Sequence, residues 1–498
     1  MTQEVEAELV LAAEDCEPAS FDNLHKFDTR WDHRTLTTLV AHGPVLLRGG
    51  RGSGKSAFMI AASRQLDPFV PGASAVGIYM SLRHAPLLRS TGDAYGKLLC
   101  EIIIRNVKDT LRDRAHDFDP APEVDDVQYA LSNLSGILKK RIVLYFDDAA
   151  HLGREASLEE FFDIYRTLSS SAVSCKAAIY PGVTRFGVRF DVYNDATVIN
   201  LLRNEELPGF AETFTAVMAA RYPDAFPDSV FSASLTRETI ASFMAQATLG
   251  NMRGFVFACN ALKARIVGRP TIGLPELGST LLDLSENYYW PLLEEIEPKL
   301  GMYEKMVETS RRVAEILFGE AAQKPRSPRD ILIHKEIDGR LAKPLQILEY
   351  AGMLSKREAS RAMKSGGRGA RYTMNLCSLL EQTRGARLTR DLFDRWVSPD
   401  REEAIQLAKS SRLSEVALPQ LPDSSEIRIF GEPIEVLKKS RAYPYGLSQQ
   451  KIEALGHAGF TAVRDLADAS DDQLDRVPSV GDVTVQRIRN VLGQAIWM

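Results

Sequence analysis

The sequence is most informative between residues 44 and 56, where it reads Pro44-Val-Leu-Leu-Arg-Gly49-Gly-Arg-Gly-Ser-Gly54-Lys55-Ser56. Its last eight residues match the pattern G-x-x-x-x-G-K-[ST], directly after an apolar run typical of a strand and before a helical run. Glycines let the backbone wrap a polyphosphate with its N–H groups, and the N-terminus of the following helix adds positive potential. The stretch therefore predicts a phosphate-binding loop.

Each position of this loop has an expected role. Lys55 is expected to reach the β- and γ-phosphates of ATP, and Ser56 is expected to hold Mg²⁺. The predicted nucleotide-binding residues are Gly49, Gly50, Arg51, Gly52, Ser53, Gly54, Lys55, Ser56 and Ala57.

Short apolar runs continue outward from the loop and alternate with longer helical patterns. The runs are Val45–Leu47, Val76–Met80, Ile142–Phe146, Ala177–Tyr180 and Thr197–Leu201. Continuous apolar strands separated by helices are what a parallel sheet covered on both faces requires. We therefore expect the α/β fold class for this half of the chain, with helical periodicity taking over after Pro208.

Two acids follow the third apolar run, where α/β sheets place ligands. Asp147 fits the acid that binds Mg²⁺ through water. Asp148 stands where many ATPases carry a glutamate that orients the attacking water, and it is shorter by one methylene. This predicts slow or regulated hydrolysis. The alternative is that two acids merely end a strand.

Weaker candidates lie further along the chain. Thr184, after the fourth run, is a candidate contact to the γ-phosphate, and Arg253, which opens a later helix, could point at the phosphates. Arg185 and Arg189 are candidates for an arginine finger acting in trans, or else are solvated surface residues. For His151 we expect a packing role.

The order of these features resembles the AAA+ ATPases of the origin-recognition and STAND groups. The features are the P-loop, the strand ending in Asp147-Asp148, a sensor-like strand, and a helical lid opening with Gly250-Asn-Met-Arg253. The resemblance covers roughly residues 20 to 265. It implies a five-stranded parallel sheet followed by a helical lid, with ATP between them. Asp148 departs from the usual Asp-Glu pair and favours STAND-like switching.

The domain organisation predicted from the whole chain has five parts. They are an AAA+ core with an N-terminal extension (1–205), a lid (206–270), a helical linker with a winged-helix domain (271–400), a linker (401–440) and a helix-hairpin-helix domain (441–498).

The middle region resembles a winged helix-turn-helix. Ser327-Pro328 predicts a helix start, and Lys343-Pro344 opens a second helix that Gly352 can end. A Gly-rich hairpin follows, with one acid, Glu358, among its cations. The cations predicted to contact DNA phosphates are Lys356, Arg357, Arg361, Lys364, Arg368 and Arg371.

The second helix of this region offers few side chains for reading bases. Its obvious polar options are Lys343, Gln346 and Glu349. Binding to the DNA backbone is therefore expected more than base recognition. A solvated hairpin and a wing used for protein contacts are the alternatives.

The last module, over roughly residues 443 to 495, resembles a tandem helix-hairpin-helix domain. The resemblance implies that backbone N–H groups near Gly481 grip a DNA phosphate at a helix start. Here Ser479 replaces the first hairpin glycine, and Asp482 adds a negative charge. A protein-docking or self-association domain is the rival interpretation.

The composition restricts which functions the protein can have. The net charge of −5 means that any nucleic-acid-binding surface must be local. Five scattered cysteines, an acidic N-terminus and the lack of a long apolar run predict a cytoplasmic protein without a membrane span. We expect an ATP-dependent switch that binds duplex DNA, with a homo-oligomer and a protein effector as further partners. The alternative is a STAND-type signalling ATPase whose C-terminal modules bind proteins.

Overall fold

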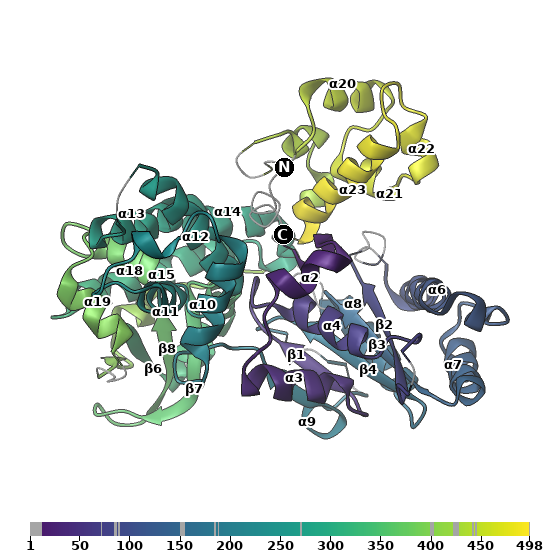
Figure 1. Cartoon of the computed structure of the whole chain (residues 1–498), viewed down its shortest axis with the longest axis horizontal. Coiled ribbons are helices and arrows are strands. Elements are labelled where there is room, and N and C mark those ends of the chain that lie inside the picture. The colour runs from purple at the N-terminus through teal and green to yellow at the C-terminus, as the bar shows by residue number, and fades with distance from the viewer. Residues whose placement is uncertain are drawn as a thin grey trace.

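The computed structural model describes residues 12–70, 72–83, 87, 90–149, 155–183, 186–187, 189–268, 271–398, 403–421, 428–440, 443 and 446–497. Figure 1 shows a sheet flanked by helices, a larger helical region beside it and a C-terminal module (yellow) above both. Among these residues, no helix combines the length and apolar character that crossing a bilayer requires.

The first region is built on a parallel sheet, as the apolar runs predict. Its strands are β1 (Val45–Arg48), β2 (Ala75–Ser81), β3 (Arg141–Asp147), β4 (Val173–Ile179) and β5 (Thr197–Asn200). They lie in the order β2-β3-β4-β1-β5, and every pairing is parallel. The first strand is therefore central, and the loop that follows it opens at the middle of the sheet's carboxyl edge.

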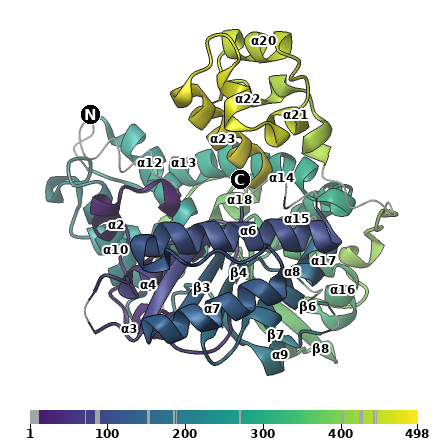
Figure 2. The ribbon, with the colours of Figure 1, turned by 90° about the vertical axis from the view of Figure 1, so that its right-hand side faces the viewer.

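Helices cover both faces of this sheet because its strands are apolar on both sides. The helices are α2 (Pro18–Leu24), α3 (Arg30–Val40), α4 (Lys55–Gln65), α6 (Gly92–Leu111), α7 (Val124–Leu138), α8 (Glu155–Leu168) and α9 (Val192–Asp195). One core joins the sheet to α6, α7 and α8, and a second core joins its other face to α3 and α4. Figure 2 shows α6 and α7 in front of the sheet.

The helical lid and linker predicted after Pro208 are present. They comprise α10 (Phe210–Arg221), α11 (Arg237–Ala247), α12 (Met252–Ile266), α13 (Leu274–Leu284), α14 (Trp290–Ile296) and α15 (Met306–Gln323). A π-helical turn, η4 (Ser285–Tyr289), joins α13 to α14.

A second, four-stranded sheet follows in the order β7-β8-β6-β9. Its elements are β6 (Asp330–His334), α16 (Lys335–Arg340), α17 (Ala342–Tyr350), β7 (Leu354–Ala362), β8 (Arg368–Met374), α18 (Leu376–Gln382), α19 (Arg390–Val397) and β9 (Ile405–Leu407). The second helix and the hairpin of the winged-helix prediction are thus α17, β7 and β8.

The helix predicted to start at Ser327-Pro328 is wrong. This segment forms strand β6, which pairs antiparallel with β8 and parallel with β9. The β-branched Ile331 and Ile333 are fully buried, so pairing within the sheet overrides the local helix-start signal.

In its described residues the last module has the short 3-10 helices η8 (Arg428–Gly431) and η9 (Ile434–Leu437), followed by the α-helices α20 (Gln449–His457), α21 (Val463–Asp468), α22 (Asp471–Asp475) and α23 (Asp482–Trp497). Its buried apolar residues, from Ile429 to Ala495, form a core of their own. By contrast, one continuous core runs from Tyr180 through the lid and the second sheet to Val416. The predicted domain boundaries stay a prediction.

Candidate nucleotide-binding site

The loop Gly49–Ser56 joins β1 to α4 at the carboxyl edge of the sheet. The Lys55 ammonium donates hydrogen bonds to the carbonyls of Gly49 (2.9 Å) and Gly50 (3.0 Å). It also lies 3.9 Å from the centroid of the Tyr180 ring. Burial lowers the pKa of Lys55 to about 8, although Asp148 and Asp147 favour its charged form. The carbonyls of the loop itself thus hold the lysine ammonium in place.

The two acids after β3 lie beside this lysine and have different surroundings. Asp147 is fully buried and accepts a hydrogen bond from the Tyr79 hydroxyl (2.8 Å). Burial and then Asp148 raise its pKa, while a hydrogen bond with Ser56 lowers it. Ser56 and Asp147, the pair predicted to hold Mg²⁺, are therefore in contact.

Asp148 is fixed rather than free. One of its oxygens accepts from Arg83 Nε (2.6 Å) and the other accepts from the Tyr180 hydroxyl (2.9 Å). Burial alone would raise the pKa of Asp148, but Arg83 and Lys55 outweigh it and hold that pKa low. One hydrogen bond to each oxygen thus fixes the orientation of this carboxylate.

A third acid, Glu14, reaches the same place from η1 (Ala13–Asp15), and no sequence pattern indicates it. Tyr79 donates to its Oε1 (2.9 Å), and Arg83 Nη1 lies 3.0 Å from its Oε2. Oxygens of Glu14, Asp147 and Asp148 all lie within 4.8 Å of one another. Burial, despite Arg83, raises the pKa of Glu14 to about 8.

The start of α12 closes over the loop. Asn251 caps the helix and donates from Nδ2 to the Arg51 carbonyl (2.6 Å), while the Arg253 N–H donates to the Gly52 carbonyl (3.2 Å). Gly52 has φ +76°, and a Cβ there would lie 2.5 Å from Arg253 Cβ, so only glycine fits. The structure thus brings Arg253 to the loop.

Arg253 meets no opposite charge there. No acidic side chain among the described residues forms an ion pair with it, and its buried Nε has no hydrogen-bond partner. Burial and then the nearby Arg51 lower its pKa. A half-buried cation whose Nε is buried without a partner indicates that an anion belongs beside it.

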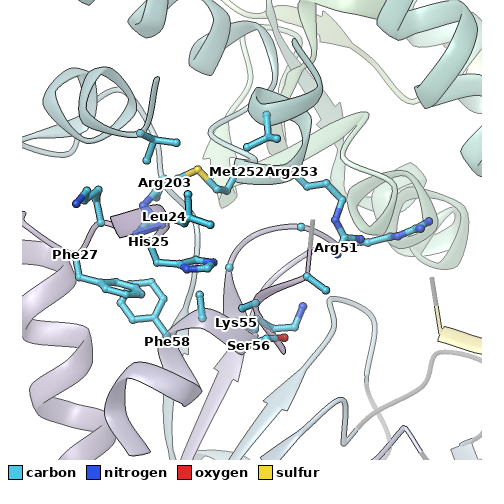
Figure 3. Close-up of a pocket in the computed structure, with 18 of the residues that line it drawn as sticks. Leu24, His25, Phe27, Arg51, Lys55, Ser56, Phe58, Arg203, Met252 and Arg253 are labelled. Atoms are coloured by element: carbon cyan, nitrogen blue, oxygen red, sulfur yellow. The ribbon is translucent and has the colours of Figure 1, made fainter. Parts of the chain in front are cut away.

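A cavity runs along this site (Figure 3). Lys55 and Ser56 lie between an end lined by His25, Phe27 and Phe58 and an end lined by arginines. Aromatic rings mark the first end, where Arg203 lies 5.2 Å from the Phe58 ring, and Arg51 and Arg253 mark the second. This arrangement suits a nucleotide with its base at the aromatic end and its phosphates at the other.

Other predicted residues are less closely tied to this site. Thr184, Arg185 and His151 lie outside the described residues, and Arg189 is exposed. Ala57 is buried at the first turn of α4. The roles assigned to these residues stay predictions.

Helix α17 lies directly on the loop, which the sequence did not indicate. The Arg51 N–H donates to the Tyr350 carbonyl (3.2 Å), and a Cβ on Gly50 would meet the Glu349 carbonyl at 3.1 Å. The rings of Tyr180 and Tyr350 are 4.9 Å apart, edge to face. The second sheet region is therefore joined to the phosphate-binding loop by backbone contacts.

The polar side chains of α17 are turned toward protein. Lys343 Nζ donates to the Gly182 carbonyl (3.3 Å), and Gln346 packs against Gly182. Glu349 accepts a hydrogen bond from the Lys356 N–H (2.8 Å). The side chains expected to read bases are thus engaged elsewhere in this conformation.

The six hairpin cations do not form one free surface, and their contact with DNA phosphates stays a prediction. Arg357 and Arg371 are only 4% and 12% exposed and pair with Glu205 (3.5 Å) and Glu206 (3.9 Å), while Lys356 pairs with an aspartate of α16. The acidic partners of Arg357 and Arg371 come from the connection after β5, from Asp330 of β6 and from the hairpin itself, where Glu358 Oε1 lies 3.1 Å from Arg371 Nε. The exposed members are Arg361, Lys364 and Arg368.

In the last module, Gly481 is exposed just before α23, and its carbonyl accepts from the Val485 N–H (2.9 Å). Ser479 adopts φ +69°, so it takes the left-handed conformation for which a glycine was expected. The Ser479 carbonyl accepts a hydrogen bond from Lys451 Nζ. Phosphate binding near Gly481 stays a prediction.

The sheet order, the loop after β1 and the helices that follow define the class: an α/β fold with a five-stranded parallel sheet, a P-loop sequence and a helical lid. The chain is similar to the Aeropyrum pernix ORC1 protein in complex with DNA, at 15% identity over 79% of this chain and 96% of that chain, with a TM-score of 0.34. It is also similar to the Aeropyrum pernix ORC2 protein in ADPNP-ADP complexes (11% identity, 76% and 98% covered, TM-score 0.40).

Domain III of the Thermotoga maritima replication initiation protein DnaA is similar over 54% of this chain and 97% of that chain, at 14% identity and a TM-score of 0.31. No protein-family model and no curated protein matches the chain. Because these identities and TM-scores are low, the functional argument depends on the chain's own residues.

Proposed function

We propose that this chain is an ATP-binding, slowly hydrolysing switch protein that couples its nucleotide state to engagement of duplex DNA by its C-terminal half. The observation that carries the proposal is the direct backbone contact between the phosphate-binding loop and α17. The same loop residue, Arg51, also accepts a hydrogen bond from the lid.

The residues present fit Mg²⁺-ATP. The loop N–H groups and Lys55 suit the phosphates, and the adjoining Ser56 hydroxyl and Asp147 carboxylate are hard oxygen donors of the kind that Mg²⁺ takes. The bound metal would neutralise charge on the β- and γ-phosphates. Asp148, held by Arg83 and Tyr180, supports slow hydrolysis.

The coupling of nucleotide binding to α17 follows because both require N–H groups of the same loop. A nucleotide requires the loop N–H groups to face its phosphates. In this conformation the Arg51 N–H is donated to Tyr350 at the end of α17. Nucleotide binding and the position of α17 are therefore linked, and anything that binds the freed helix must in turn change the nucleotide affinity.

The test is steady-state ATP hydrolysis by the full chain with and without duplex DNA, with Lys55→Ala as the blank. We expect a low basal rate that duplex DNA raises several-fold and that the variant abolishes. A rate that stays at the level of the blank, or that DNA does not change, would refute the coupling of ATP hydrolysis to DNA.

A second candidate is a STAND-type signalling ATPase whose C-terminal modules bind proteins. It is favoured by the ion pairs that occupy Arg357 and Arg371 and by the burial of α17. Replacing the exposed cations Arg361, Lys364 and Arg368 by alanine separates the two candidates.

If the hairpin binds DNA, the slope of log affinity against log salt should become shallower by about 0.9 for each DNA phosphate that the variant no longer neutralises. The matched control replaces three exposed cations of the first region, Arg30, Arg34 and Lys139. If both variants behave like the wild type, the hairpin does not bind DNA and the protein-binding candidate gains support.

A further inference from the structure

Two arginines lie close together at one end of the nucleotide pocket, and the protein does not satisfy either of them. Arg51 is only 10% exposed, and its Nε and Nη1 are buried without hydrogen-bond partners. The Nε of Arg253 is likewise buried without a hydrogen-bond partner. Figure 3 shows both side chains at the end of the cavity opposite His25 and Phe27, and each lies within electrostatic range of the other.

The acid nearest to Arg51 does not account for its position. Glu295 Oε1 lies 3.6 Å from Arg51 Nη2, beyond hydrogen-bond distance. The same oxygen accepts a hydrogen bond at 3.0 Å from Lys299, which is 4% exposed. Glu295 therefore has a buried cation of its own, and Arg51 can turn away without leaving that carboxylate alone.

Other cations at this end of the pocket are already engaged. Lys55 donates to two loop carbonyls, and Arg83 is paired with Asp148 and Glu14. The unfilled N–H groups belong to Arg51 and Arg253, and two buried like charges are stabilised by an anion between them. A guanidinium is suited to this because its planar N–H groups match phosphate oxygens in pairs.

We propose that Arg51, which lies beside Arg253, binds the terminal phosphate of a nucleoside triphosphate and is the residue that distinguishes the triphosphate from the diphosphate. This proposal rests on the nucleotide site proposed above. Arg51 belongs to the same loop that contacts α17 and the lid through its N–H and carbonyl. The side chain that senses the terminal phosphate is thus attached to the peptides that hold the neighbouring modules.

The test is calorimetric titration of the full chain with Mg²⁺-ADPNP and with Mg²⁺-ADP, for the wild type, Arg51→Ala and Arg51→Lys. We expect Arg51→Ala to weaken ADPNP binding by about 10- to 100-fold, as loss of hydrogen bonds to a charged group does. ADP binding should change by less than about three-fold, and Arg51→Lys should recover part of the loss.

The matched control is Arg48→Ala. Arg48 is three residues earlier, and its Nε donates to Asn200 (2.7 Å). We expect this variant to keep the wild-type ratio of ADPNP to ADP affinity. Melting temperatures of all variants verify folding, and if Arg51→Ala does not fold, the ratio in Arg51→Lys decides.

The two possible failures are distinguishable. If the wild type binds neither nucleotide, the nucleotide-binding function itself is wrong. If the wild type binds both nucleotides and the Arg51 variants keep their ratio, or lose both equally, then Arg51 does not sense the terminal phosphate and this inference is overturned.

Discussion

A buried ion pair ties the first helices to the connection that leads into the lid, and breaking it should destabilise the protein strongly. Arg203 Nη2 lies 2.5 Å from Asp32 Oδ1, and the two side chains are 8% and 0% exposed. The guanidinium also lies 5.3 Å from the Trp31 ring and 5.2 Å from the Phe58 ring. We consider Arg203→Met, which keeps the apolar stem and removes the charge.

The expected loss in the free energy of unfolding depends on the hydrogen bonds that Asp32 keeps in the variant. Removing one partner of a buried pair costs about 3–5 kcal/mol, because the other charge stays buried. Asp32 keeps hydrogen bonds from the Thr29 hydroxyl (2.6 Å) and the Thr29 N–H (3.2 Å), so we expect the lower end, about 3 kcal/mol. In the background of Asp32→Asn, the same substitution should cost about 1 kcal/mol, which gives a coupling of about 2 kcal/mol.

Urea unfolding followed by far-ultraviolet circular dichroism measures these differences in the free energy of unfolding. All four members of the cycle are compared: the wild type, the two single variants and the double variant. If Arg203→Met alone costs less than about 1 kcal/mol, or if the two single costs simply add, the carboxylate and guanidinium do not depend on each other. The reasoning from burial would then be refuted.

Two further predictions concern stability. Burial lowers the pKa of His25 from 6.5 to about 4, so the unfolded chain binds a proton that the folded chain does not. The contribution of His25 to stability is therefore complete above pH 6.5 and is lost as the pH falls toward 4, by up to about 3 kcal/mol. Replacing it, as His25→Gln, should flatten this part of the pH dependence of the melting temperature. Gly250 has φ +69°, and a Cβ there would lie 1.9 Å from the Arg203 carbonyl, so Gly250→Ala should cost more than about 2 kcal/mol in urea unfolding.

Each of these predictions has its own control. Gly268 has a similar φ of +73°, but a Cβ there would meet no atom within 4 Å, so Gly268→Ala should cost only about 1 kcal/mol. Equal costs at the two glycines would mean that the close approach to Arg203 has no energetic effect. For His25, an acid dependence that is identical in the variant and the wild type would show that other groups dominate.

The parts of the fold that could be predicted are those with local signals. The apolar runs of the first sheet are buried on both faces, so composition alone marks them as parallel strands. Strand β6 was mistaken for a helix because its identity depends on pairing with β8, about 40 residues later in the chain. Its helix-start signal, a serine followed by proline, is local and was overridden.

The candidate site likewise contains residues that a local pattern predicts and residues that depend on contacts distant in the chain. Lys55, Ser56 and Asp147 belong to patterns whose spacing carries the chemistry, and they lie together as expected. Glu14 reaches the site across 65 positions from Tyr79, so no spacing could indicate it. The burial of Arg357 could not be predicted for a similar reason, because its acidic partner Glu205 lies 152 positions away in the chain; Arg371, by contrast, also lies 3.1 Å from Glu358 within the hairpin.

The continuous core of the lid and the second sheet has an evolutionary consequence. Phe243 of α11 and Phe393 of α19 have ring centroids 4.5 Å apart, although they are 150 positions apart in the chain. Because residues in contact have coupled effects on stability, we expect substitutions at these two positions to be correlated among relatives of this chain. The last module, from Ile429 to Ala495, carries its own core and meets the rest of the chain where η8 (Arg428–Gly431) contacts η5 (Glu297–Lys299), so its exchange between genes as one unit would leave the larger core intact and change only this contact region.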